Sequence, residues 1–150
     1  MKERSFANPL SQMRWLGVCC CLSIIVLVQP VYAEIAVIVG THSDLKQLDK
    51  QALVDIYLSK TNKAPDGTAV IPLDNTGKIR SQFYRVTVNK SLKQLRRFWS
   101  HQVVQATGEP PKELDSDKEI LDVVSRNPNT LGYVDRAHVN DQVRVLLTLP

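Results

Sequence analysis

The stretch Ala69–Phe83, AVIPLDNTGKIRSQF, holds the residues best suited to bind a small ligand. It predicts a short apolar strand over Ala69–Leu73, a polar turn over Asp74–Gly77 and a helix that starts near Lys78. A turn between a strand and a helix leaves backbone N–H groups without partners, and the helix dipole adds to their attraction for an anion. The candidate ligand-binding residues of this turn are Thr76, Gly77, Lys78 and Arg80. In the alternative interpretation, the two cationic side chains are simply solvated.

A second polar loop, Gly40–Asp44, follows the apolar run Ile35–Val39 and adds the hydroxyl groups of Thr41 and Ser43. Ligands of open α/β sheets bind at the carboxyl ends of strands, so we expect this loop and the Asp74–Gly77 turn to lie at one edge. Hydroxyl groups, free N–H groups and cations suit a small oxyanion better than a sugar or a flat aromatic molecule. The sequence therefore predicts a small-anion site whose residues are Thr41, Ser43, Thr76, Gly77, Lys78 and Arg80.

The sequence carries no recognisable catalytic motif. Its three histidines, His42, His101 and His138, lack the spacing of a zinc site. It has no G-x-S-x-G nucleophile elbow, no Walker loop and no G-x-G-x-x-G. An enzyme is therefore the weaker functional class, and we expect neither a metal nor a cofactor.

Apolar segments and helical periodicities alternate along the chain. The predicted strands are Ile35–Val39, Ala69–Leu73, Leu131–Val134 and Val143–Leu147, and the predicted helices span residues 49–58, 78–89, 91–108 and 116–127. The first strand is apolar throughout rather than alternating, which is typical of a strand buried on both faces. This order predicts an α/β fold, a single three-layer lobe with a mainly parallel or mixed sheet.

The predicted helix after Ser91 is amphipathic and basic. Ser91 and Gln94 form a capping box at its start. Its apolar stripe consists of Leu92, Leu95, Trp99, Val103 and Ala106. No acidic residue lies between Asp74 and Glu109, while seven lysines and arginines do. We interpret most of this charge as the solvated face of the helix. The polar face has no stacking aromatics, so we expect no nucleic-acid partner.

Residues 1–33 have the three-part layout of a secretory signal peptide, with a basic start, an apolar run over Trp15–Val28 and cleavage after Ala33. The apolar run is shorter than the ~20 residues that a membrane-spanning helix needs. We therefore expect a periplasmic domain over residues 34–150 with no stable membrane anchor after cleavage. An uncleaved anchor, or a lipoprotein modified at Cys19, is the alternative. All three cysteines lie within the predicted signal peptide, so the mature domain would contain no disulfide.

Four segments of the chain together resemble a known family. They are IAVIVG (35–40), LVDIYLSKTNKAPDGTAVIPLD (53–74), RSQFYRVTVNKSLKQLRRFWS (80–100) and ATGEPPKELDSDKEILDVVSRNPNTLGYVD (106–135). The most specific pieces are T-G-x-P-P after the Trp99 helix and N-P-x-x-L-G-Y-V over residues 127–134. This pattern resembles the short, single-lobe members of the PstS-like phosphate-binding family, which are periplasmic substrate-binding proteins of ABC transporters.

The resemblance implies a type II periplasmic-binding-protein fold, with phosphate held at the turn Asp74–Arg80. Where the family has a Ser-Gly-Thr-like run, this chain has Asn75-Thr76-Gly77-Lys78-Ile79. One hypothesis is therefore an exported small-anion binding protein, with phosphate as its ligand and an ABC importer or another envelope protein as its partner. The other is an exported accessory or interaction domain that keeps the fold but has lost the ligand, with the basic face Lys93–Arg97 as its contact surface.

Overall fold

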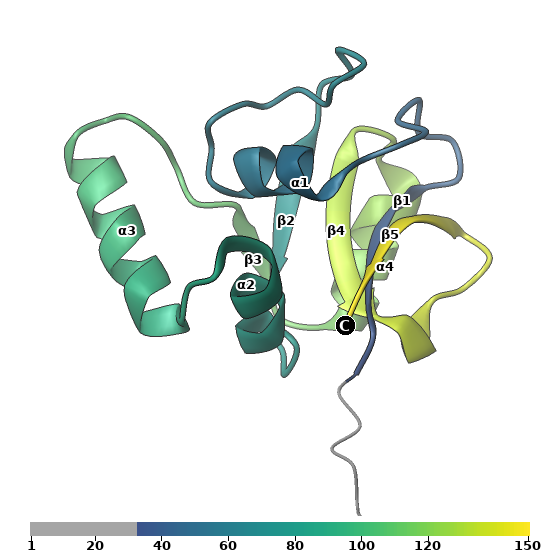
Figure 1. Cartoon of the computed structure of the whole chain (residues 1–150). Coiled ribbons are helices and arrows are strands. Elements are labelled where there is room, and N and C mark those ends of the chain that lie inside the picture. The colour runs from purple at the N-terminus through teal and green to yellow at the C-terminus, as the bar shows by residue number, and fades with distance from the viewer. Residues whose placement is uncertain (1–32) are drawn as a thin grey trace, which may run out of the picture. The chain divides into compact units, whose positions relative to one another are not determined.

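The computed structural model describes residues 33–150, so nearly all of the predicted signal peptide lies outside the described residues (Figure 1). The strands are β1 (Ile35–Gly40), β2 (Ile71–Asn75), β3 (Lys112–Leu114), β4 (Thr130–Asp135) and β5 (Val143–Leu149). The helices are α1 (Lys50–Tyr57), α2 (Arg80–Val88), α3 (Leu92–Val104) and α4 (Asp117–Arg126), and a 3₁₀ turn, η1, spans Arg136–His138. Within residues 33–150, no helix is long and apolar enough to cross a membrane.

The five strands form one mixed sheet in the order β3-β2-β4-β1-β5. β2 pairs in parallel with both β3 and β4. β1 runs the opposite way, antiparallel to β4 on one side and to β5 on the other. The predicted α/β class is confirmed, and the sheet is of the mixed kind.

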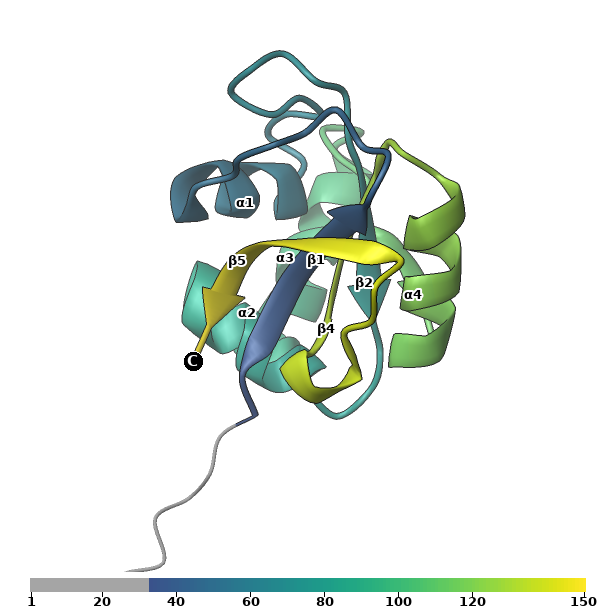
Figure 2. The same cartoon turned by 90° about the vertical axis from the view of Figure 1, so that its right-hand side faces the viewer.

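Helices cover both faces of the sheet and produce three layers (Figures 1 and 2). On one face, α1, α2 and α3 pack over Val37 and Tyr133 through an apolar core that includes Phe83 and Trp99. On the other face, α4 packs over Ile38 and neighbouring side chains in a smaller core. All six residues of β1 are buried, as expected for a strand covered on both sides.

Local sequence signals position the helix starts. The Asp49 carboxylate accepts a hydrogen bond from the Ala52 N–H at 2.7 Å and caps α1. Ser91 and Gln94 form the predicted capping box of α3. At α4, the Ser116 hydroxyl accepts from the Glu119 N–H, but the Glu119 carboxylate reaches one residue further back, to the Asp115 N–H at 2.8 Å.

Four details differ from the sequence prediction. The strand expected over Ala69–Leu73 is found two residues later, and the short edge strand β3 was not predicted. α3 ends at Val104 rather than near Gly108. The apolar stripe of α3 is buried at Leu95 and Trp99 but exposed at Val103, because its last turn extends beyond the part that covers the core.

α4 approaches β4 closely at Gly132. A Cβ atom at this position would lie 2.6 Å from Cγ2 of Ile120 and 3.1 Å from Cγ2 of Val124. Side-chain carbons at such distances clash, so glycine allows the helix to lie directly on the strand. This contact fixes the height of the α4 N-terminus above the sheet edge.

Candidate functional site

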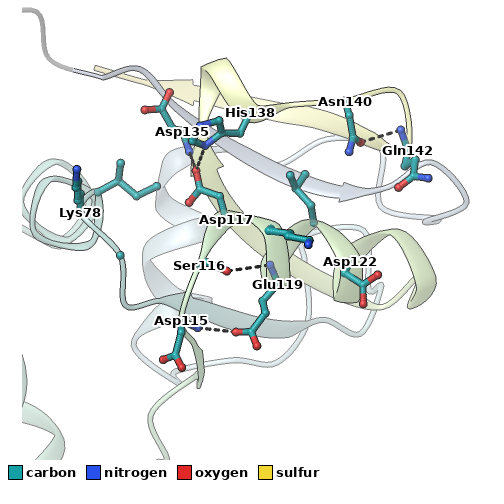
Figure 3. Close-up of a pocket in the computed structure, with 14 residues that line it drawn as sticks. Lys78, Asp115, Ser116, Asp117, Glu119, Asp122, Asp135, His138, Asn140 and Gln142 are labelled. Carbon is teal, nitrogen blue, oxygen red and sulfur yellow. Dashed lines mark hydrogen bonds and ion pairs between the residues drawn. The ribbon is translucent and has the colours of Figure 1, made fainter.

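The parallel strands β2, β3 and β4 end together at one edge of the sheet. A groove of about 1110 Å³ lies at this edge, between the turn that leads into α2 and the first turns of α4 (Figure 3). It is lined by Gly77, Lys78, Ile79, Asp115, Ser116, Asp117, Lys118, Glu119, Leu121, Asp122, Asp135, His138, Asn140 and Gln142. This is the position in which open α/β sheets bind their ligands.

The predicted anion turn forms one wall of this groove. The Thr76 N–H donates to the Leu114 carbonyl at 2.9 Å, and the Thr76 hydroxyl is 3.3 Å from both the Leu114 carbonyl and the Asp115 carboxylate. The Gly77 N–H donates to Oδ1 of Asn75 at 2.8 Å. α2 then begins without a side-chain cap, next to the exposed Lys78. The turn therefore retains an open helix N-terminus and one cation.

Arg80, by contrast, is already occupied by carboxylates. Its Nη2 atom lies 2.7 Å from Oδ2 of Asp74 and also contacts Oε1 of Glu113. Asp74 is buried, and its other oxygen accepts a 2.6 Å hydrogen bond from the Tyr133 hydroxyl. Burial raises the pKa of Asp74, while the Tyr133 hydrogen bond and the Arg80 charge act against that rise. Arg80 therefore serves as the counter-ion of a buried carboxylate, a role that the sequence did not predict, and its predicted anion contact stays a prediction.

Thr41 and Ser43 do not join this groove. Because β1 is antiparallel to β4, the carboxyl end of β1 lies at the opposite edge of the sheet, where Val39 pairs with Leu131. Ser43 is buried and accepts a hydrogen bond from the Leu45 N–H at 3.3 Å. Each of the two polar loops follows the end of a strand, as predicted. The expectation that both loops lie at the same edge of the sheet is wrong.

The loop that contains Thr41 and Ser43 is tied to the last strand by one arginine. Arg144 donates to the carbonyl oxygens of Thr41 at 3.3 Å, Ser43 at 3.0 Å and Leu45 at 2.7 Å. These bonds satisfy backbone carbonyls and give the loop a structural role.

Acidic side chains dominate the groove. Five carboxylates line it, against two lysines and one histidine. The acidic residues are Asp115, Asp117, Glu119, Asp122 and Asp135, and Figure 3 shows several of them around the start of α4. Carboxylates repel an approaching oxyanion, so the local charge opposes the helix N-terminus.

Asp117 organises the centre of the groove. Its Oδ1 atom accepts a hydrogen bond from the Asn75 amide, and its Oδ2 atom accepts from the Asp135 N–H at 3.0 Å and lies 2.5 Å from Nδ1 of His138. The hydrogen bond to Asp117 raises the pKa of His138. Sequence reasoning explained Asp117 only as part of a helix start. One sequence feature could have pointed to Asp117: it directly follows the helix cap Ser116, and the first residues of a helix that follows a strand lie near the edge of the sheet.

The chain combines a mixed five-stranded sheet, helices on both faces and a groove at the ends of the parallel strands, and this α/β fold matches that of solved periplasmic-binding-protein-like structures. Solved structures agree at the level of fold. A protein from Clostridium perfringens assigned as a phosphate ABC transporter substrate-binding protein, solved with bound phosphate, matches with a TM-score of 0.58 and 20% identity over 76% of this chain and 45% of its own.

Two further structures match in the same way. An ABC-type phosphate transport receptor from Vibrio cholerae has a TM-score of 0.58 at 13% identity, covering 76% of this chain and 46% of its own. PstS from Borrelia burgdorferi has a TM-score of 0.54 at 13% identity, covering 76% of this chain and 47% of its own. The chain thus spans less than half the length of these structures. No protein-family model and no curated protein matches the sequence.

Proposed function

We propose that this chain is an exported small-anion binding lobe related to the substrate-binding components of ABC transporters, with phosphate as the ligand. The observation that carries the proposal is the uncapped start of α2 beside the exposed Lys78, at the edge where three parallel strands end. Backbone N–H groups at such a helix start attract anions. The fold it shares with a phosphate-bound structure supports the same ligand.

In this proposal the ligand-binding residues reduce to the turn Thr76–Lys78. Lys78 supplies the cation, and backbone N–H groups at the start of α2 supply hydrogen bonds. Arg80 holds the turn in place through Asp74 and does not contact the ligand. The acidic lining of the groove and its open side keep the affinity modest, because solvent weakens each electrostatic contact.

The test is thermal unfolding of the exported protein with phosphate, sulfate or chloride at constant ionic strength. A ligand at about 100 times its dissociation constant adds about 2.7 kcal/mol to the free energy of unfolding, which raises the midpoint by several degrees. We expect a saturable rise with phosphate that Lys78→Ala abolishes and that the control Lys63→Ala, an exposed lysine outside the groove, leaves intact. An unchanged phosphate response in Lys78→Ala would contradict the site.

The acidic groove favours a second candidate, an exported accessory domain that keeps the fold without the ligand. Its supporting observation is that Arg80 already pairs with Asp74 and Glu113. Among the residues that line the groove, two lysines, Lys78 and Lys118, then face five carboxylates. A flat response of the wild-type protein to phosphate, sulfate and chloride favours this candidate. Its partner would then be an envelope protein rather than a small anion.

A further inference from the structure

The outer face of α3 is a basic surface with an apolar end. Lys93, Arg96, Arg97 and His101 are exposed on it and line a shallow hollow together with Ser100 and Val104. None of these four side chains makes an ion pair with another described residue. Figure 1 shows α3 at the outer side of the fold, beyond α2 and β3. We call this surface the α3 face.

Apolar exposure on the last turn of α3 is unusual for this molecule. Val104 is 86% exposed and Val103 is 55% exposed, and they are two of the three large hydrophobic side chains exposed among the described residues. The sequence pattern places Val103 on the same stripe as the buried Leu95 and Trp99, yet the core does not reach it. Exposed apolar groups within a polar surround mark interaction surfaces.

The groove at the sheet edge has the complementary composition. The partly buried Leu121 lies among carboxylates of the groove. Two of these carboxylates, Glu119 and Asp122, are exposed, and their spacing of three residues places them on the same side of α4. Glu119 makes no ion pair among the described residues, and Asp122 pairs only with Arg126, within its own helix. One molecule therefore carries a basic surface with an apolar end and an acidic groove that contains the apolar side chain of Leu121.

We propose that the α3 face of one copy docks into the acidic groove of a second copy of this chain. Opposite charges attract across such a contact, whereas α3 against α3 or groove against groove would place like charges together. Arg96 and Arg97 of the first copy would neutralise the carboxylates in the groove of the second copy, and Val104 of the first copy would cover Leu121 of the second. The proposal goes beyond the proposed function and holds whether or not the groove contains an oxyanion.

Sedimentation equilibrium of the exported protein tests this contact. The α3-face variant carries Arg96→Glu and Arg97→Glu, and the groove variant carries Glu119→Lys and Asp122→Lys. We expect the wild type to associate at low ionic strength and to dissociate as salt is added. Each variant alone should sediment as a monomer, a fall in mass of at least twofold. An equimolar mixture of the two should form a one-to-one dimer, because one intact groove then meets one intact α3 face.

A matched control separates specific docking from a change in net charge. Lys50→Glu with Lys63→Glu alters the net charge as much as the α3-face variant does, at exposed lysines away from both surfaces. This control should associate like the wild type. A monomeric wild type at low salt, an α3-face variant that still associates, or a mixture that remains monomeric would each overturn the proposal. Circular dichroism verifies folding, and Arg96→Gln with Arg97→Gln replaces the charge reversal if that variant unfolds.

Discussion

Arg80 lies in the turn expected to bind an anion, yet its guanidinium already contacts two carboxylates. The Asp74 side chain is only 3% exposed, and a buried carboxylate is costly unless a cation and hydrogen-bond donors compensate it. Arg80 and the Tyr133 hydroxyl provide that compensation from α2 and β4. The pair therefore ties the start of the site helix to the sheet.

We expect Arg80→Met to lower the free energy of unfolding by about 3 kcal/mol at neutral pH, because the buried Asp74 carboxylate loses its counter-ion. Burial already raises the pKa of Asp74, and loss of Arg80 raises it further. A carboxyl group whose folded-state pKa lies above its unfolded value favours folding when protonated, so the deficit of the variant should shrink as pH falls through that pKa.

Urea unfolding of the wild type and Arg80→Met at neutral and acidic pH measures this difference. Arg85→Met is the control on the same helix, since Arg85 is exposed and makes no ion pair with a described residue. A deficit of equal size at both pH values would mean that Arg80 contributes packing rather than charge.

At the level of elements, the sequence predicts what is decided locally. The caps Asp49, Ser91 and Ser116 determine where three helices begin, and each was recognisable from residues within one turn. The direction of β1 was not recognisable, because a continuous apolar run looks the same in parallel and antiparallel pairing. Because the direction of β1 was unknown, the sequence prediction placed Thr41 and Ser43 in the candidate site, whereas they lie at the opposite edge of the sheet.

β3 was missed for a related reason. Its three residues, Lys112–Leu114, have no apolar run, and they form a strand only because β2 lies beside them in parallel register. Four of the five acidic residues of the groove lie close together in residues 115–122, but only the tertiary fold places them opposite the turn at the end of β2 and adds Asp135 from the end of β4. Sequence reasoning therefore found the turn at the end of β2 but not the carboxylates that oppose it.

The packing of α4 on β4 leads to a prediction about Gly132. We expect Gly132→Ala to destabilise the protein by about 1–3 kcal/mol, because the new methyl group would meet Ile120 and displace the helix. Ile120→Ala removes the atom that lies nearest to that methyl group. Urea unfolding measures the free energy of unfolding of both single variants and of the double variant. We expect the double variant to lose less of this free energy than the sum of the two single losses. Strict additivity would contradict direct contact.

For the whole molecule, we predict that the exported protein begins at Glu34. Cleavage after Ala33 would remove only one described hydrogen bond of that residue, from Nε2 of Gln82 to the Ala33 carbonyl at 2.7 Å. The Glu34 carbonyl would keep its bond to the Arg136 N–H at 2.8 Å, so the sheet would begin intact. Mass spectrometry of the protein recovered from the cell envelope measures the first residue.

Ala33→Trp is the matched variant for that experiment, because the cleavage site requires a small residue. It should leave the chain uncleaved. An exported wild-type chain that retains Met1 would contradict the prediction and favour an anchored form.

The position of β1 between β4 and β5 has a consequence for how the chain folds as it is synthesised. This strand is synthesised early, but its partners β4 and β5 lie about 100 residues later in the sequence, so its pairing has a high entropic cost of loop closure. Before β4 and β5 are synthesised, the segment IAVIVG is unpaired, uncharged and of high β-propensity. Segments of this type can pair with other chains and aggregate. Nascent or truncated chains without β5 would leave one side of this strand open. The pairing of β1 on both sides therefore requires synthesis to pass β5.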